Sequence, residues 1–234
     1  MKGILLIVDG LGDLPVPALD GRTPLEAAHT PVMDALASAG RYGLVDPIQP
    51  GETPNTHSGA GQLLGLDPGQ ADFLKRGPVE AAGLDMPLAV GDIALRANFA
   101  TVKETENGLL IVDRRAGRIA EGAAELAKSL DGMELGHGVT VRLRSTEQHR
   151  CVLVLSGPGL EAEVSDTDPG NRRMPALSPP CRALDPAAQF TARVVNRFVH
   201  SAHRLLDRHP LNASRKAAGL MAANGIITRG AGKA

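Results

Sequence analysis

The sequence is poor in aromatic side chains and in cysteine. Phe, Tyr and Trp together make up 2% of the 234 residues, with no Trp and a single Tyr. Proteins that bind single-stranded nucleic acid stack bases on such rings, so we expect no nucleic-acid partner. The two cysteines, Cys151 and Cys181, match neither a metal-binding spacing nor a disulfide framework. This favours free thiols in a reducing compartment.

An excess of one charge and a long apolar run are also missing. The 25 basic and 26 acidic residues give a formal net charge of −1, which excludes a general attraction to nucleic acid or to anionic membranes. No apolar stretch is long enough to span a bilayer, and the N-terminal run MKGILLIVDG lacks the cleavage site of a secretory signal. We therefore expect a soluble, cytoplasmic protein without a membrane partner.

Residues 1–68 carry the pattern of an α/β fold. The continuous apolar run at residues 3–9 is typical of a strand that is buried on both faces of a parallel sheet. Residues 42–48 predict a second strand. Between them, Thr23 and Pro24 predict a helix start. Pro31 predicts a break into two short helices.

The pattern changes at about residue 69. Short apolar runs that alternate with Asn-Gly and Ala-Gly turns predict antiparallel strands between residues 88 and 120. Helices are predicted at residues 121–132 and 190–209, the second with one apolar face. Residues 69–209 therefore read as an inserted α+β domain, and residues 210–234 as a return to the first domain.

The first domain alone contains too few strands to enclose a core. One β-α-β unit and one returning strand leave a parallel sheet largely uncovered. The sequence therefore predicts a partial, mostly parallel core, and we expect further strands to come from a segment or chain outside this sequence.

Asp9 ends the first predicted strand, where open α/β sheets place their ligands. It is a candidate ligand for a divalent cation, and it could equally cap the following turn. Gly10 and Gly12 do not form a dinucleotide fingerprint, because the third glycine is missing and no helix start follows.

A second candidate is the loop Asn55-Thr56-His57-Ser58. Its hydroxyl groups could act as nucleophiles only if a base or a metal lowered their pKa. The Gly-x-Ser-x-Gly elbow of serine hydrolases is absent. A turn whose side chains bond their own backbone is the alternative, and the loop taken by itself favours that turn.

Arginines gather beside the turns of the inserted domain. Guanidinium groups bind phosphate and carboxylate oxygens in a bidentate way, so this concentration indicates a pocket for a small anion. A solvated strand edge is the alternative for any single arginine. The acidic turn at residues 165–169 is of a type that is usually structural. The arginines are Arg76, Arg96, Arg114, Arg115, Arg118, Arg150, Arg172 and Arg173.

Several motifs, in this order and spacing, resemble the archaeal-type, cofactor-independent phosphoglycerate mutases of the alkaline phosphatase superfamily. The resemblance covers nearly the whole chain. The motifs are ILLIVDGLGD, GRTPLEAAHTP, LLGLDP, RGPVEAAG, GDIALRANFATV, DRRAGRIAEGAAELAKSL, HRCVLVLSGPGL, VSDTDP and ANGIITRGAG.

The resemblance implies a metal-dependent mutase that interconverts 3- and 2-phosphoglycerate through a phosphoenzyme. It implies two divalent ions (Mn, Mg or Zn) and no organic cofactor. Asp9 would be a metal ligand, and Thr56 both a ligand and the nucleophile. The implied substrate-binding residues are Asn55, Arg96, Asp113, Arg114, Arg115, Arg118, Asp166 and Arg229, in which the two aspartates orient arginines.

The chain departs from the family in two places. Many relatives carry a histidine four residues after the nucleophile, where Ala60 stands here and His57 directly follows Thr56. The remaining metal ligands belong to a C-terminal half, and no histidine follows His209. We therefore expect an incomplete chain with weak activity, complemented by a second half or by a homo-oligomer. Alternatives are a phosphatase or phosphotransferase for another small phosphate or phosphonate, and a non-catalytic module that binds phosphorylated metabolites.

Overall fold

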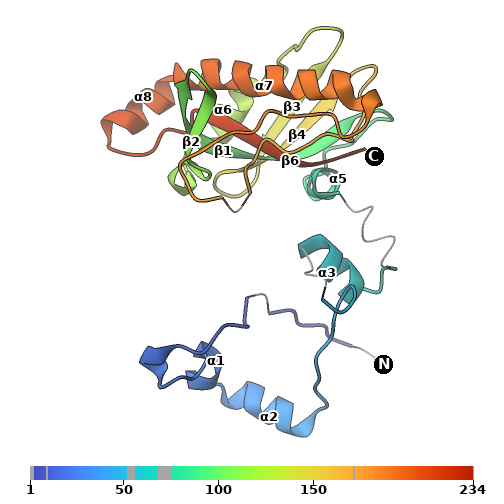
Figure 1. The fold of residues 1–234 in the computed structure, drawn as a ribbon, viewed down its shortest axis with the longest axis vertical. Coiled ribbons are helices and arrows are strands. Elements are labelled where there is room, and N and C mark those ends of the chain that lie inside the picture. The colour runs from blue at the N-terminus through green and yellow to red at the C-terminus, as the bar shows by residue number, and fades with distance from the viewer. Residues whose placement is uncertain (1–2, 9, 52–55, 68–74, 171, 234) are drawn as a thin grey trace. The chain divides into compact units, whose positions relative to one another are not determined.

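The computed structural model describes residues 3–8, 10–51, 56–67, 75–170 and 172–233 of the chain. The chain divides into two compact units, Met1–Asp46 and Pro47–Ala234, which we call unit 1 and unit 2. Figure 1 shows the elements of each unit.

Unit 1 contains short helices that begin where the sequence predicts. A capping box closes the start of α1, because the Thr23 side chain accepts from the Glu26 amide and the Glu26 carboxylate accepts from the Thr23 amide. Pro31 is the first residue of the next helix, so the predicted break is confirmed. The elements are η1 (Pro17–Leu19), α1 (Pro24–Ala27) and α2 (Pro31–Ala39).

The strands predicted at residues 3–9 and 42–48 are not present in the described part of unit 1. Its one backbone bridge joins Val16 and Arg22. A strand exists only when a neighbour satisfies its backbone hydrogen bonds. Neither apolar run pairs with a strand in the described residues, and Ile4, for example, is 97% exposed. The predicted strands and their burial are therefore not found in the described residues of unit 1.

Unit 2 is a mixed α/β structure. Its helical elements are α3 (Thr56–Leu63), α5 (Arg76–Ala82), η2 (Ala116–Arg118), α6 (Ala123–Leu130), η3 (Pro186–Ala188), α7 (Gln189–Asp207) and α8 (Pro210–Ala217). Its strands are β1 (Ile93–Thr105), β2 (Gly108–Asp113), β3 (Thr140–Ser145), β4 (Arg150–Ser156), β5 (Ala176–Leu177) and β6 (Gly225–Lys233).

The six strands form one sheet in the order β3-β4-β1-β2-β5, with β6 also paired to β1. The predicted hairpin is confirmed, since Glu106 and Asn107 connect β1 to β2, and Gly108 pairs with Thr105. The expectation of a mostly parallel sheet is not confirmed, because every strand pair described is antiparallel. Residues 210–234, expected to return to the first domain, instead contribute α8 and β6 to unit 2.

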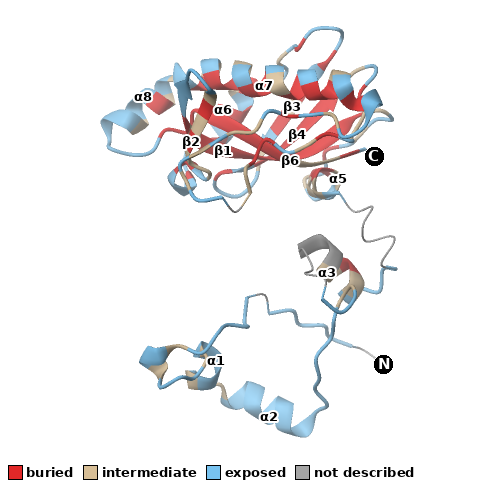
Figure 2. Ribbon diagram, viewed as in Figure 1, coloured by how far each residue is buried: buried red, intermediate tan, exposed pale blue. Residues whose placement is uncertain are grey.

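The two faces of this sheet differ in chemistry. On one face, Leu95, Ala97 and Phe99 of β1 pack with the apolar side of α7 and α6 in the main core. Figure 2 shows this core as a continuous buried layer. The alternate residues of β1 and β4 point to the other face, where a smaller apolar cluster includes Ala94 and Val152.

The second face is only partly covered by α5, which packs on β1, β4 and β6. Gly77 lies so close to β1 that a Cβ atom on it would stand 2.0 Å from the carbonyl oxygen of Ala94. Glycine is thus what allows α5 to dock at this distance.

Two expectations from composition can be compared directly with the structure. Both cysteines are free, as predicted, and both are buried. In the part of the chain that the structure describes, no helix combines the length and the apolar character needed to cross a bilayer.

Candidate anion-binding site

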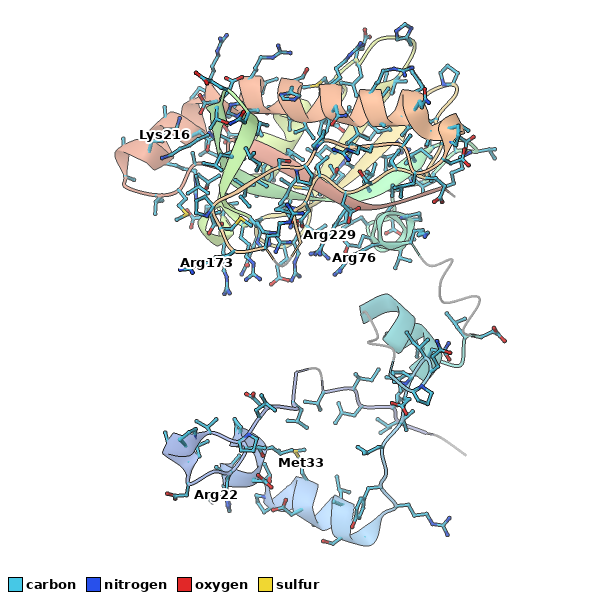
Figure 3. All side chains as sticks on the ribbon, in the orientation of Figure 1. Arg22, Met33, Arg76, Arg173, Lys216 and Arg229 are labelled. Carbon is cyan, nitrogen blue, oxygen red and sulfur yellow. The ribbon has the colours of Figure 1, made fainter. Side chains whose placement is uncertain are left out.

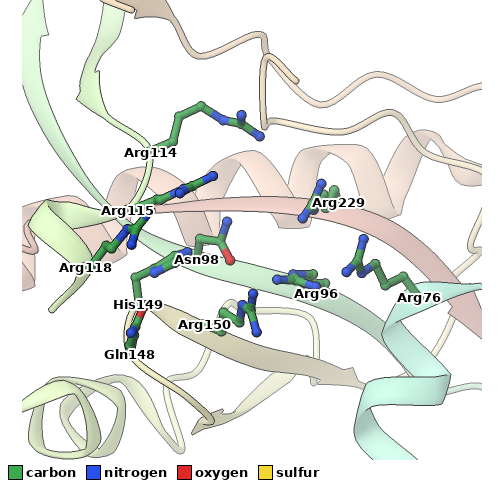
Figure 4. Close-up of a pocket in the computed structure, with 10 residues that line it drawn as sticks. All are labelled: Arg76, Arg96, Asn98, Arg114, Arg115, Arg118, Gln148, His149, Arg150 and Arg229. Carbon is green, nitrogen blue, oxygen red and sulfur yellow. The ribbon is translucent and has the colours of Figure 1, made fainter. Parts of the chain in front are cut away.

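A cationic cavity of about 400 Å³ lies on the sheet face opposite α7, and we call it the arginine pocket. Figure 3 shows Arg76, Arg173 and Arg229 projecting on this side of unit 2, and Figure 4 shows the pocket itself. Seven arginines line it together with three neutral polar residues. The lining consists of Arg76, Arg96, Asn98, Arg114, Arg115, Arg118, Gln148, His149, Arg150 and Arg229.

The sheet register brings four of these side chains together from distant parts of the sequence. Arg96 on β1 stands directly opposite Arg229 on β6. Two residues further, Asn98 stands opposite Arg150 on β4. Directly opposed residues project from the same face with their Cβ atoms about 5 Å apart. Like charges in such a pair destabilise a sheet, so this register favours anion binding over stability.

The turn after β2 supplies Arg114, Arg115 and Arg118. The carboxylate of Asp113 accepts hydrogen bonds from the amides of Arg115 and Gly117, at 2.6 and 3.3 Å. Arg118 has a φ of 56°, in the left-handed region that side chains other than glycine rarely adopt. Strained backbone of this kind is typical of functional turns. The turn therefore holds its guanidinium groups toward one cavity (Figure 4).

Asp168 fixes the orientation of Arg114. Both oxygens of the carboxylate accept from the guanidinium group at 2.7 Å, in a bidentate ion pair. The Nε atom of Arg229 lies 3.9 Å from the same carboxylate. The Asp168 side chain is 2% exposed, so solvent screens this pair weakly.

Glu80 holds the other end of the pocket. One of its carboxylate oxygens accepts from Arg76 at 3.0 Å and from Arg96 at 2.6 Å. Arg76 and Glu80 both belong to α5, and Glu80 also binds Arg96. The position of this short helix therefore sets the positions of two pocket arginines, Arg76 and Arg96. The α5 docking on β1 is therefore part of the construction of the site.

Burial changes the protonation equilibria of the pocket. Desolvation lowers the pKa of Arg96 to about 10, while the neighbouring Glu80 carboxylate opposes this shift. Arg96 therefore stays charged at neutral pH. Burial also lowers the pKa of His149 to about 4, and the nearby Arg150, Arg115 and Arg96 lower it further, against Asp113. His149 is thus a neutral imidazole at neutral pH.

Several buried polar atoms of the arginine pocket have no hydrogen-bond partner. They are the Nε atoms of Arg96 and Arg229, the Oδ1 atom of Asn98 and the Nδ1 atom of His149. An unpartnered buried polar atom costs about 1 to 3 kcal/mol. Their concentration in one cavity indicates a place where a polar ligand supplies the missing partners.

Five arginines that were selected from the sequence line this cavity together: Arg96, Arg114, Arg115, Arg118 and Arg229. The two aspartates predicted beside them do not line it. Each accepts backbone hydrogen bonds in a segment that carries a pocket arginine, as described above for Asp113. Asp166 accepts from the amide of Gly230 at 2.9 Å, directly after Arg229. Burial raises the pKa of Asp166 despite this hydrogen bond.

The contacts of the arginine pocket do not show where the predicted nucleophile and the predicted metal ligands lie. Asp9 and Asn55 lie outside the described residues. Thr56 is the first residue of α3. Within the described part of the chain, no group of three or more His, Cys, Asp or Glu side chains could hold a metal ion. The described residues therefore do not by themselves form a site for the expected cations.

The sequence did not single out Asn98, Gln148, His149, Asp168 or Glu80. A signal for Asn98 was available, because Arg96 and Asn98 alternate with apolar residues along a strand otherwise suited to a core. Two polar residues on one face of such a strand indicate a cavity. Glu80 and Asp168 became visible only through their contacts.

The fold and the arginine pocket define an antiparallel α+β unit suited to binding a small polyanion. Sequence comparison places residues 37–212 within the profile described as "2,3-bisphosphoglycerate-independent phosphoglycerate mutase". The chain belongs to this family.

Individual relatives agree with this assignment. The chain is 43% identical over 236 residues to 2,3-bisphosphoglycerate-independent phosphoglycerate mutase 1 of Methanothermobacter thermautotrophicus, covering 99% of this chain and 56% of the relative. It is 44% identical over 234 residues to the mutase of Methanopyrus kandleri, covering 99% and 55%. It also matches the solved cofactor-independent phosphoglycerate mutase of Thermoplasma acidophilum, at 40% identity and a TM-score of 0.63, covering 97% and 58%.

The chain spans about half the length of the curated relatives it matches. The family assignment covers its sequence and its α/β fold. It does not by itself assign the reaction of the full-length relatives to this chain.

Proposed function

We propose that this chain carries the substrate-binding site of a phosphoglycerate mutase that interconverts 3- and 2-phosphoglycerate. The observation that carries the proposal is the gathering of seven arginines in one cavity of about 400 Å³, in a chain whose formal net charge is −1. Phosphoglycerate has a phosphate group and a carboxylate group, which together carry roughly three negative charges at neutral pH. Guanidinium groups match both in geometry and charge.

Arginines from different structural elements are proposed to bind different anionic groups of the substrate. In this proposal Arg96 and Arg229, on paired strands, bind one anionic group of the substrate. Arg114, Arg115 and Arg118, on the turn after β2, bind the other. Asp113 and Asp166 keep the backbone of these segments in place through the hydrogen bonds described above.

Phosphoryl transfer is assigned to Thr56. Its hydroxyl oxygen attacks phosphorus, the bond from phosphorus to the substrate oxygen breaks, and that oxygen takes up a proton. The phosphoryl group then moves from Thr56 to the other hydroxyl of the same glycerate, and the threonine hydroxyl is restored. Asn55 binds a phosphate oxygen during both steps. The residue assignment is supported by the resemblance alone.

Asp9 and Thr56 are our proposed ligands for the divalent cations of the family (Mn, Mg or Zn). Such cations lower the pKa of a bound hydroxyl and neutralise phosphate charge. The described residues supply no cluster of ligands, so further ligands are proposed to come from a complementing half or from a second copy of the chain. Because the chain spans 56% of its relative, we expect weak turnover from the chain alone.

The test is a search for phosphorylated Thr56. The chain is incubated with 3-phosphoglycerate and Mn²⁺, and intact mass and peptide mapping detect any added phosphoryl group, while NMR detects 2-phosphoglycerate. We expect the adduct on Thr56 and its loss in Thr56→Ala. Ser58→Ala, a nearby hydroxyl removed in the same way, should keep the adduct. An adduct that persists in Thr56→Ala, or no adduct while the substrate is bound, would contradict the assignment.

The same experiment separates the alternatives. A non-catalytic binding module would bind 3-phosphoglycerate in the presence of a chelator and in Thr56→Ala, and it would form no adduct. A phosphatase or phosphotransferase would form the adduct with a different phosphoester or phosphonate and would release inorganic phosphate or a new ester.

A further inference from the structure

Two unpartnered hydrogen-bond acceptors lie in the wall of a pocket that is lined mainly by arginine donors. They are the Oδ1 atom of Asn98 and the Nδ1 atom of His149. Both residues are 6% exposed, and neither atom has a hydrogen-bond partner. Figure 4 shows the two side chains next to each other, with the amide oxygen of Asn98 facing the space between Arg115 and Arg96.

Backbone structure fixes both residues in this position. Asn98 follows Arg96 by two residues on β1 and therefore shares its face of the sheet. His149 immediately precedes β4, and its carbonyl oxygen accepts from the amide of Phe99 at 2.7 Å. Asn98 is thus held within β1, and the turn residue His149 is fixed to β1 through its carbonyl group.

The substrate's anionic groups cannot satisfy these two atoms. Arginine side chains are donors only, and phosphate and carboxylate oxygens are acceptors at neutral pH. An anion therefore pairs with the arginines and leaves Asn98 Oδ1 without a donor. His149 is neutral in the pocket, as argued above from its lowered pKa. With its proton on Nε2, the Nδ1 atom keeps a lone pair that also needs a donor.

An alcohol is the group that fits this requirement. A hydroxyl donates one hydrogen bond and accepts others, so it can bind between an acceptor such as Asn98 Oδ1 and the surrounding guanidinium donors. We propose that Asn98 and His149 bind the free hydroxyl group of the ligand, which donates its one proton to either Asn98 Oδ1 or His149 Nδ1, so that the arginine pocket selects phosphorylated hydroxy acids over the same acids without a hydroxyl. This inference rests on the proposed function and adds a specificity determinant to it.

The expected preference for a ligand with a hydroxyl group follows from the free-energy cost of leaving a buried acceptor without a hydrogen bond. A ligand without the hydroxyl leaves a buried acceptor unpaired and loses about 1 to 3 kcal/mol of binding free energy. Sites built to pair with a substrate hydroxyl reject its deoxy analogue for this reason. We therefore expect about 10- to 100-fold weaker binding of the deoxy analogue, at equal ligand charge.

The test is a pair of calorimetric titrations on the wild-type chain. One ligand is 3-phosphoglycerate, and the other is 3-phosphonooxypropanoate, which is the same molecule without its 2-hydroxyl group. Asn98→Ala should reduce the affinity ratio of the two ligands at least fivefold, mainly by weakening 3-phosphoglycerate. Combined with His149→Ala, it should bring the ratio near one. Asn107→Ala, which removes an exposed amide of the same type in the hairpin turn, should leave the ratio unchanged.

The outcomes distinguish the inference from the proposed function. If neither ligand binds, both fail. If both ligands bind the wild-type chain with equal affinity, the hydroxyl contact is wrong, while the arginine pocket remains a site for the anion. If Asn98→Ala weakens both ligands by the same factor, Asn98 has a structural role and the inference is overturned. The wild-type comparison holds whether or not the variants fold, and circular dichroism checks their folding.

Discussion

Replacing Asp168 with alanine is expected to lower the free energy of unfolding by about 3 to 5 kcal/mol, the usual effect of breaking a buried ion pair. The carboxylate is 2% exposed and binds Arg114 through both oxygens at 2.7 Å. It also accepts from the amide of Gly170 at 3.1 Å and lies 3.9 Å from Arg229. Its removal leaves two arginines without their nearest anion. Urea denaturation followed by circular dichroism measures the loss.

Added inorganic phosphate should restore part of this loss, because an anion in the pocket can replace the missing carboxylate as a partner. The matched control is Glu161→Ala. Glu161 pairs with Lys233 at 2.6 Å, but both side chains are about two-fifths exposed, so we expect a change below about 1 kcal/mol. Equal effects of the two substitutions would show that Asp168 does not fix Arg114 as described.

Gly77→Ala is expected to lower the free energy of unfolding by about 3 kcal/mol, through overpacking between α5 and the sheet. The new methyl group would stand 2.0 Å from the carbonyl oxygen of Ala94 and 2.6 Å from the amide nitrogen of Leu95. Both are backbone atoms, which cannot rotate away. Relief requires α5 to move, and the helix carries Arg76 and Glu80 with it.

Gly83→Ala is the matched control for this substitution. Gly83 lies at the end of the same helix with a φ of −65°, and a Cβ atom there would meet nothing closer than 3.6 Å. Alanine in such a position restricts the unfolded chain and is expected to be neutral or to stabilise by about 0.5 to 1 kcal/mol. If both variants were equally stable, α5 would not be docked on β1 at the distance described.

The motif resemblance assigned five of the seven pocket arginines to the site, and Arg76 and Arg150 were candidates through their positions beside turns. The contacts between these arginines could not be predicted from the sequence. Arg96 and Arg229 are separated by 133 positions and become neighbours only through the register of β1 with β6. Register depends on which strands pair, and local patterns carry no information on pairing between distant segments.

The N-terminal region also shows what an apolar pattern cannot predict. An apolar run such as residues 3–9 indicates side chains that favour burial. A strand also needs a neighbouring strand that forms hydrogen bonds with its backbone. The described part of unit 1 offers no such neighbour for this run. Helix starts were predicted more reliably, because the capping box of Thr23 and Glu26 involves only residues three apart.

Binding of 3-phosphoglycerate by the arginine pocket is the central claim, and calorimetry on the chain and two arginine variants tests it most directly. Arg115 is an exposed pocket arginine, and Arg208 is an exposed arginine outside the pocket. We predict one ligand bound per chain, about 10- to 100-fold weaker binding in Arg115→Ala from the loss of a charged hydrogen bond, and unchanged binding in Arg208→Ala. Absence of binding to the wild-type chain, or equal affinities in the three proteins, would contradict the account.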